Sequence, residues 1–500
     1  MLAFESATTL AAKLRARKIG CVELLDYFIA RGDKYGSAVN AIVVRDLDKA
    51  RQRAAAADQA LARGETWGPL HGVPMTIKES FHLTGTPTTF GFPQFRENLA
   101  TSNAVVVDRL LKAGAVIFGK SNVPPGLMDG QSWNEVYGRT NNPWDLARTP
   151  GGSSGGAAAA LAAGLTGLEL GSDIASSIRN PAHFCGVFGH KPTFGLCPQR
   201  GHMLTEQLHT TDIGVVGPLA RSARDLELAL SIIAGPDEGF PGPAVVAGPR
   251  SRRDSLHEFR VALVLDDSFA DVDRSIQSCL EDLGRFLEKA GASVDRRARP
   301  GFDSERLYML YMMLLRAATS PAASNEEFLE ATTHARGVTS DTRDAAKANA
   351  FGLTLSHRDW IGLDEERQRI RRQWHDFFER FDVLLCPVLS TAAFPHSTVH
   401  PQQRALTVNG KEVRFENQLL WAGYGGLAHL PATVAPIGQT SQGLPVGVQI
   451  IGPYAQDLTC LHFAGLLEER YRGFVPPPAS PVIEVGAPRG GSRSTAAHFR

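Results

Sequence analysis

The segment from Gly151 to Arg179 constrains the fold of this chain most, because it holds two glycine-flanked serine turns within an apolar stretch. The first turn is Gly-Gly-Ser-Ser-Gly-Gly (151–156), and the second is Gly-Ser-Asp-Ile-Ala-Ser-Ser-Ile-Arg (171–179). Apolar residues lie between them, at 157–165, and after them, at 184–188. A Gly/Ser linker has no such flanks, so the segment belongs in a folded core. Glycine beside serine lets backbone N–H groups converge on a reacting carbonyl, which indicates a nucleophile site.

Helical and strand-like patterns alternate along most of the 500 residues. This alternation predicts an α/β fold, with a largely parallel or mixed sheet covered by helices. The alanine run at 157–163 favours a helix that begins just after Ser153 and Ser154. Further helices are predicted at 8–30, 46–62, 105–112 and 276–290, and strands at 73–78, 115–118, 261–265, 383–389 and 446–451.

We expect one domain over residues 1–485. Within it, about 304–381 is rich in helical pattern and lacks a strand signal, so we interpret it as an insertion on the sheet. Residues 486–500 are rich in Gly, Ser and Arg and follow a proline-rich stretch, which predicts a flexible C-terminal tail.

Three of the seven methionines, Met309, Met312 and Met313, cluster in one predicted helix of the insertion. Such adaptable apolar side chains suit a pocket for a hydrophobic group, and they equally suit a buried core helix. The sequence leaves both interpretations open.

Composition excludes several classes of protein. Lys plus Arg and Asp plus Glu both number 52, so the formal net charge of zero predicts no nucleic-acid partner. The six cysteines are far apart, which argues against a zinc cage and a disulfide framework. No apolar stretch approaches the ~20 residues of a spanning helix, and residues 1–20 do not resemble a secretory signal. We therefore expect a cytoplasmic protein with no membrane partner.

Residues 114–121 match the P-loop pattern G-x-x-x-x-G-K-S, but their physical context is wrong. The middle of the motif is the apolar strand predicted at 115–118, and Pro124 and Pro125 block the helix that should follow. We do not expect nucleotide binding here.

Ser154 also fits the G-x-S-x-G elbow of α/β-hydrolases, with His183 and His190 as the nearest histidines in sequence. That elbow must follow a buried strand, whereas residues 141–150 are polar and broken by prolines. An α/β-hydrolase-like esterase with a Ser154-His pair remains an alternative.

Lys78 ends an otherwise largely apolar strand and is a candidate base for a serine nucleophile. Burial would lower its pKa, and a neutral amine can accept a proton. The alternative is a lysine whose charged end reaches water at the end of the strand. Lys120 and Lys191 are rivals by the same argument.

An ordered series of motifs resembles the amidase signature family across most of the chain. The matching segments are Leu70–Glu79, Gly119–Pro124, Gly138–Trp144, Gly151–Gly156, Gly171–Pro181, Cys185–Thr193, Gly217–Arg221 and Gly443–Gln449. The resemblance implies a single large mixed β-sheet sandwiched by helices and a Ser-cisSer-Lys hydrolase. It assigns Ser177 as the nucleophile, Ser153 as the bridging serine and Lys78 as the base.

The same resemblance implies an oxyanion hole made of the backbone N–H groups of Ile174, Ala175, Ser176 and Ser177. The implied substrate is a small-molecule amide, hydrophobic or aryl, with esters or carbamates as further options. No metal or organic cofactor is expected, and homodimers are common in the family.

Ser154, Asp173 and Arg179 are expected to support the two turns. Ala175 and Ser176 depart from the Gly-Gly that is common in the family. A side chain forced into a left-handed backbone there would cost about 1 kcal/mol. Two other functions stay open: the amidase subunit of a glutamine-dependent tRNA amidotransferase, and a binding protein without activity.

Overall fold

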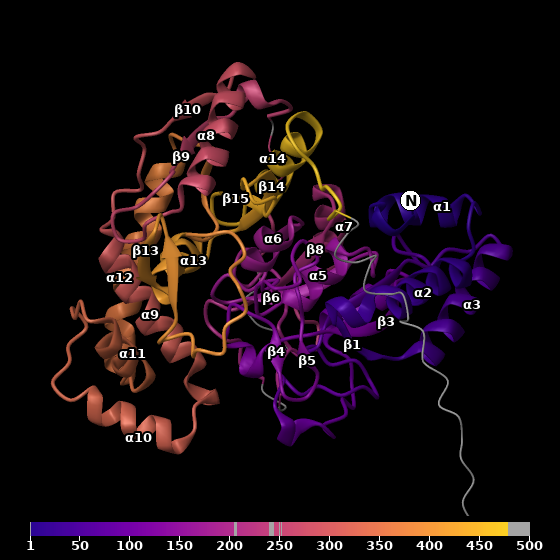
Figure 1. Cartoon of the computed structure of the whole chain (residues 1–500), viewed down its shortest axis with the longest axis horizontal. Coiled ribbons are helices and arrows are strands. Elements are labelled where there is room, and N and C mark those ends of the chain that lie inside the picture. The colour runs from indigo at the N-terminus through magenta and orange to yellow at the C-terminus, as the bar shows by residue number, and fades with distance from the viewer. Residues whose placement is uncertain (1, 205–207, 240–244, 250, 252, 479–500) are drawn as a thin grey trace, which may run out of the picture.

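The computed structural model describes residues 2–204, 208–239, 245–249, 251 and 253–478, and the tail predicted at 486–500 lies outside them. A large sheet runs through the molecule in the order β1-β3-β2-β6-β8-β7-β14-β15-β11-β9-β10 (Figure 1). β2 is parallel to β3 and β6, whereas β6 is antiparallel to β8, so the sheet is mixed as predicted. Its strands are β1 (Ile42–Arg45), β2 (Pro74–Lys78), β3 (Val116–Ser121), β6 (Glu169–Asp173), β7 (Phe188–Lys191), β8 (Val215–Ala220), β9 (Arg260–Leu263), β10 (Ser293–Asp295), β11 (Val383–Pro387), β14 (Ala432–Gln439) and β15 (Pro445–Ile451).

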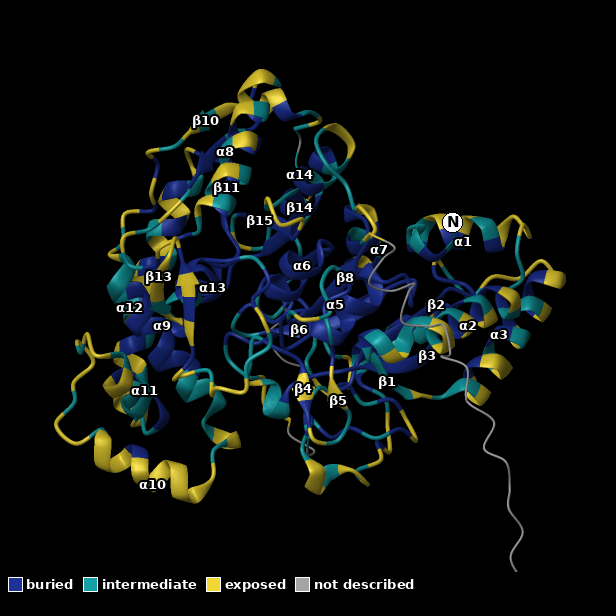
Figure 2. Ribbon diagram, viewed as in Figure 1, coloured by how far each residue is buried: buried dark blue, intermediate teal, exposed yellow. Residues whose placement is uncertain are grey.

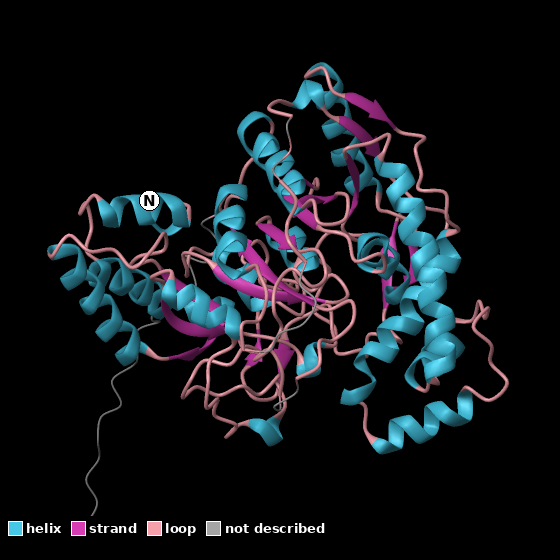
Figure 3. Ribbon diagram, turned by 180° about the vertical axis from the view of Figure 1, so that it is seen from behind, coloured by secondary structure: helices cyan, strands magenta, loops and turns pink. Residues whose placement is uncertain are grey.

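Helices flank this sheet along its length (Figure 3). They are α1 (Ala7–Arg15), α2 (Cys21–Val39), α3 (Leu47–Ala62), α4 (Val105–Lys112), α5 (Gly155–Ala162), α6 (Arg179–Cys185), α7 (Ala223–Ile233), α8 (Arg274–Lys289), α9 (Ser304–Thr319), α10 (Asn325–His334), α11 (Ala345–Leu353), α12 (His357–Phe378), α13 (Leu419–Gly426) and α14 (Asp457–Arg470). Two small hairpins, β4 (Trp133–Asn134) with β5 (Gly138–Arg139) and β12 (Ala405–Val408) with β13 (Lys411–Arg414), complete the fold.

The single helix predicted at 8–30 is wrong, because the structure has two helices there, α1 and α2. The chain breaks between them where Arg17 adopts a positive φ of 53°. An L-residue in that conformation cannot continue a right-handed helix.

The neighbouring strands β3, β2 and β6 are buried at every position, as expected where helices cover both faces. β2 therefore carries Lys78 into the interior at its C-terminal end. The apolar middle of the P-loop-like motif lies in β3, which confirms the strand predicted there.

α5 lies at the centre of the molecule and is buried along its whole length (Figure 2). Its glycines allow close backbone contact, since a Cβ at Gly156 would overlap the backbone nitrogen of Asn122. The preceding Gly152 likewise faces the backbone of Asp129 and Gln131. These glycines let the first serine turn sit against neighbouring backbone.

Residues 304–381 form α9 to α12 and one short 3-10 helix, and this stretch, described throughout, contains no strand. These helices lie together at one side of the molecule, with α10 at its margin (Figure 1). α9 is the buried member, because every residue from 307 to 315 is buried. One of its faces borders the site described next.

Candidate active site

Lys78 lies at the end of β2 and has no exposed surface. Its Nζ is 2.6 Å from Ser153 Oγ and 2.8 Å from Ser172 Oγ. Burial lowers the pKa of Lys78 to about 7, although the charge of Asp173 acts in the opposite direction. The amine is therefore directed at two serine hydroxyls in the interior, and its charged end does not reach water.

The first serine turn positions Ser153 and Ser154 in different ways. The peptide bond between Gly152 and Ser153 is cis. Ser153 Oγ accepts the hydrogen bond from Lys78. The N–H of Ser154 instead donates to the carbonyl oxygen of Ser177 at 3.1 Å, so the backbone of one turn holds the other.

The second turn is organised around the carboxylate of Asp173. It accepts hydrogen bonds from the N–H groups of Ser176 (2.9 Å), Ile178 (3.0 Å) and Arg179 (3.2 Å). It also binds the Arg179 guanidinium through Nε at 3.0 Å and Nη2 at 2.8 Å. Burial would raise the pKa of Asp173, but the guanidinium and these donors outweigh it and lower the pKa to about 2. The carboxylate stays charged and fixes the turn.

Arg179 extends this network across the molecule. Its Nη1 donates to the carbonyl oxygen of Ala422 in α13 at 3.0 Å and to Gln449 Oε1 in β15 at 2.7 Å. Asp173 and Arg179 are fully buried, and a bidentate charged pair of this kind has one defined geometry. The turn is therefore locked to elements far away in sequence.

Ser177 is 6% exposed and lines a cavity, so its hydroxyl has access to a ligand. Within the described residues no hydrogen bond joins this hydroxyl to Ser153 or Lys78. The structure thus brings Lys78 and Ser153 together, and it links Ser177 to them through the backbone of Ser154.

The four backbone donors expected for an oxyanion are not equivalent. The N–H of Ser176 already donates to Asp173, so it is not free to bind an oxyanion. Among the described residues, no acceptor takes the N–H groups of Ile174, Ala175 or Ser177. Ser176 has a φ of 77°, which is the left-handed conformation. The strain expected when Ser176 replaces the glycine that is common in the family therefore applies at this position.

Two supporting residues have no signal in the sequence. Ser172 accepts the second hydrogen bond of Lys78, and Tyr311 donates from its hydroxyl to the carbonyl oxygen of Ile174 at 2.8 Å. Ser172 is one residue before Asp173 in the second turn, and only the pairing of β2 with β6 shows that it faces Lys78. Tyr311 comes from α9, more than a hundred residues away.

The Ser154-His alternative is wrong for this structure. Ser154 Oγ contacts the backbone of Ser172, and no histidine in the described chain bonds it. His183 bonds a backbone carbonyl and a backbone N–H, and His190 bonds a threonine and an aspartate. No strand of the main sheet leads directly into the turn, because residues 141–150 form only two isolated bridges and turns.

Lys120 and Lys191 do not serve these serines. Lys120 Nζ donates to the carbonyl oxygen of Pro87 and to Thr88 Oγ1, and Lys191 Nζ donates to the carbonyl oxygen of Pro192. Their pKa values are also lowered by burial, to about 8 and about 7, so a lowered pKa alone does not identify the base. Contact with Ser153 distinguishes Lys78.

The cavity beside Ser177 encloses about 180 Å³. Its walls include the second turn, the C-terminal half of α9 and residues 415–419. Of the three clustered methionines, Met312 lines the cavity, and Met309 and Met313 lie in the core. The apolar lining residues are Leu127, Met128, Ile174, Ala175, Met312, Leu315, Leu389, Phe415 and Leu419.

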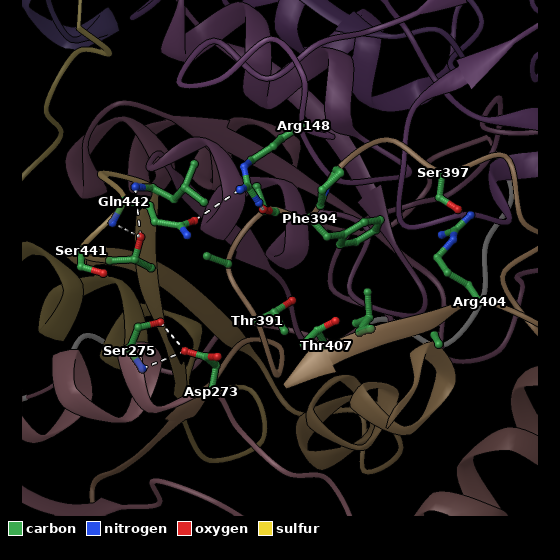
Figure 4. Close-up of a pocket in the computed structure, with 17 residues that line it drawn as sticks. Arg148, Asp273, Ser275, Thr391, Phe394, Ser397, Arg404, Thr407, Ser441 and Gln442 are labelled. Atoms are coloured by element: carbon green, nitrogen blue, oxygen red, sulfur yellow. Dashed lines mark hydrogen bonds between the residues drawn. The ribbon is translucent and has the colours of Figure 1, made fainter. Parts of the chain in front are cut away.

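A second cavity, of about 470 Å³, lies near β12 and contains none of the candidate catalytic residues (Figure 4). Its two arginines already have carboxylate partners: Arg148 binds Asp145 at 3.0 Å and Arg404 binds Asp129 at 2.6 Å. Of these two cavities, the one beside Ser177 is therefore the one that candidate catalytic residues line.

Neither a metal cluster nor a membrane helix is found in the part of the chain that the structure describes. No group of three or more His, Cys, Asp or Glu side chains there could hold an ion. No described helix is both long and apolar enough to cross a bilayer.

Fold and site together define an α/β protein with a buried lysine–serine cluster beside a cavity. A family model described as Amidase matches residues 23–461. The chain belongs to this amidase family and is therefore an enzyme that hydrolyses amides.

Curated relatives agree over nearly the whole length. An acylamidase of Rhodococcus erythropolis is 34% identical over 93% of this chain and 94% of its own. An indoleacetamide hydrolase of Bradyrhizobium diazoefficiens is 33% identical, covering 93% and 86%. One subunit of a glutamyl-tRNA(Gln) amidotransferase from a Synechococcus species is 30% identical, covering 94% and 97%. A solved amidase structure superposes with a TM-score of 0.75 at 28% identity, over 93% of this chain and all of that one.

Proposed function

We propose that the enzyme cleaves the C–N bond of hydrophobic or aryl carboxylic amides through an acyl-enzyme on Ser177, with Ser153 and Lys78 as its proton relay. The hydrogen bond from fully buried Lys78 to Ser153 carries the proposal. A lysine with a pKa near 7 is partly neutral at neutral pH, and its free electron pair can then accept a proton.

In the first step, Lys78 Nζ takes the proton of Ser153 Oγ, and Ser153 takes the proton of Ser177 Oγ as that oxygen attacks the carbonyl carbon. The relay requires Ser177 Oγ to reach Ser153 Oγ when substrate binds, and catalytic hydrogen bonds often tighten only in that complex. The oxygen of the tetrahedral intermediate then becomes negatively charged. We assign its stabilisation to the N–H groups of Ile174, Ala175 and Ser177.

Collapse of the intermediate breaks the C–N bond, and the relay returns a proton to the departing nitrogen. An ester between the acyl group and Ser177 remains. Water then attacks this ester, losing its proton to the same relay, and releases the carboxylic acid. The lining of the cavity supports hydrophobic or aryl groups, since an apolar cavity of roughly 150 Å³ holds a benzene ring.

Labelling with a fluorophosphonate, followed by peptide mass mapping, tests the assignment of the nucleophile. We expect modification of Ser177 and complete loss of both labelling and aryl-amide hydrolysis in Ser177→Ala. Ser176→Ala is the matched control, because it removes a neighbouring hydroxyl and keeps the N–H that Asp173 binds. Labelling of another serine, or turnover by Ser177→Ala, would refute the mechanism.

The second candidate function is that of one subunit of a tRNA amidotransferase. The similarity to relatives with that name supports it. Such a protein would act inside a complex. Two measurements on the purified chain distinguish the two candidate functions: its molecular mass by light scattering and its turnover of simple amides. A homodimer that hydrolyses aryl amides supports the first candidate, and a chain that is active only in a larger assembly supports the second.

A further inference from the structure

Arg316 in α9 lines the same cavity as Ser177. The charges of Glu327 and Glu416 act on its guanidinium, but neither carboxylate forms a salt bridge with it. Each of the two carboxylates of the cavity wall forms its salt bridge with another arginine: Asp129 binds Arg404 at 2.6 Å and Glu416 binds Arg414 at 2.9 Å. Within the described residues, no ion pair or hydrogen bond involves the Arg316 guanidinium, and its Nε is buried without a partner. A buried N–H donor without an acceptor is costly, so the Nε of Arg316 calls for an explanation.

Gln418 supplies a second unsatisfied group on the same cavity wall. Its side chain is 1% exposed, and neither its amide nitrogen nor its amide oxygen has a hydrogen-bond partner. The amide nitrogen is a donor, as is every N–H of a guanidinium. Two donors without acceptors on one cavity wall match the oxygens of a carboxylate.

α9 also sets the distance between this polar end and the nucleophile. Tyr311 binds the carbonyl oxygen of Ile174, which fixes that point of the helix at the second turn. Arg316 lies five residues further, roughly 7–8 Å along the helix axis. Met312 and Leu315 line the cavity in between. A ligand that reaches from the turn to Arg316 therefore needs an apolar spacer about as long as one aromatic ring.

We propose that this cavity selects amides that carry a carboxylate, separated from the scissile carbonyl by one aromatic ring or a short aliphatic chain, and that Arg316 and Gln418 bind that carboxylate. The inference rests on the proposed function, whose substrate class it narrows. Arg316 is a specificity residue in this scheme, and the proton relay operates without it.

Matched substrates test the proposal. On the acyl side, the mono-p-nitroanilide of adipic acid is compared with hexanoyl p-nitroanilide. On the amine side, para-acetamidobenzoate is compared with para-acetamidobenzamide. We expect kcat/KM to favour the carboxylate by at least about tenfold in one of the two pairs. In Arg316→Met that ratio should fall by at least about tenfold, mainly through KM.

Arg369→Met is the matched control, because it removes one positive charge from the same helical region at an exposed site outside the cavity. The ratio should stay unchanged in this variant. A ratio near one for both pairs in the native enzyme, or equal ratios in native and Arg316→Met enzyme, would overturn the proposal.

Binding to Ser177→Ala separates this proposal from the mechanism. Calorimetry should show that the variant binds adipate or para-acetamidobenzoate, and that adding Arg316→Met weakens this binding at least about tenfold. Arginine-dependent binding without hydrolysis by native enzyme would support the carboxylate site and reject the proposed function. Hydrolysis with labelled Ser177, but without arginine-dependent preference, would reject the carboxylate site alone.

Discussion

Lys78 is the residue whose charge should govern the rate. Only its neutral form accepts a proton, and burial lowers its pKa to about 7. Below pH 7 the lysine is increasingly protonated, so log(kcat/KM) should rise with a slope near one and level off above about pH 7. Rates from pH 5 to 9 on a neutral amide measure this. A flat profile with chemistry still rate-limiting would point to another base.

Replacing the proposed base gives a complementary prediction. Lys78→Ala should lower kcat by about 10²–10⁴-fold, the usual contribution of general base catalysis. Lys120→Ala is the matched control, because it also removes a buried lysine with a lowered pKa, yet contacts no proposed catalytic serine. Its kcat, measured on correctly folded protein, should stay within severalfold of the native value. If kcat fell further in Lys120→Ala than in Lys78→Ala, Lys120 and not Lys78 would be the base.

Ser176 combines a left-handed backbone with a buried hydroxyl that has no partner. Glycine relieves the strain, worth about 1–2 kcal/mol, and removes the unsatisfied group, but costs about 0.5–1 kcal/mol in chain entropy. Ser176→Gly should therefore raise the free energy of unfolding by about 1 kcal/mol in urea denaturation. Ser176→Ala keeps the strain and should gain less. A destabilised glycine variant would show that the hydroxyl is used.

At the scale of single residues, the sequence could predict only those parts of the site that the family motifs contain. Lys78 and Ser153 could be paired through the resemblance, and the structure places them in hydrogen-bond contact. Ser172 could not be recognised, because its role depends on which strand lies beside β2. The engagement of the Ser176 N–H by Asp173 likewise depends on the shape of the turn.

At the element scale, α9 contains two buried tyrosines whose hydroxyl groups differ in their hydrogen bonding. Tyr311 bonds the turn at Ile174, whereas Tyr308 has a buried hydroxyl without a partner. Tyr311→Phe should cost about 1 kcal/mol of unfolding free energy and lower kcat several-fold, because the turn loses an anchor. Tyr308→Phe should be neutral or stabilising. Equal effects on kcat would show that α9 does not position the turn.

Elements with a regular pattern were predictable and irregular ones were not. The helix predicted at 105–112 has the same bounds as α4. β14 carries a proline, a glycine and a shift in register, which together hide its strand pattern. The hairpin of β12 and β13 is exposed at half or more of its positions, so it lacks the apolar run that reveals a buried strand.

At the scale of the whole molecule, one buried ion pair joins segments that are far apart in the sequence. Arg179 begins α6 and contacts Asp173 at the end of β6, but it also reaches Gln449 in β15 and Ala422 in α13. β6 and β15 belong to one continuous sheet, with three strands between them. Arg179 and Gln449 are 270 residues apart in the sequence, and no local pattern encodes such a contact. The sequence could therefore indicate that Arg179 supports the turn, but not that Arg179 connects the turn to β15.

A double-mutant cycle on this pair measures that connection. Arg179→Met leaves a buried carboxylate without its main partner and Asp173→Asn leaves a buried guanidinium, so each should cost about 3–5 kcal/mol of unfolding free energy. The double variant buries neither charge and should cost less than the sum, with a coupling of about 1–3 kcal/mol. Arg200→Met in the partly exposed pair with Asp237 should cost at most about 1 kcal/mol. Urea denaturation gives the unfolding free energies of all four variants. If the losses at positions 173 and 179 were strictly additive, the ion pair would not act as a unit in holding the site to the sheet.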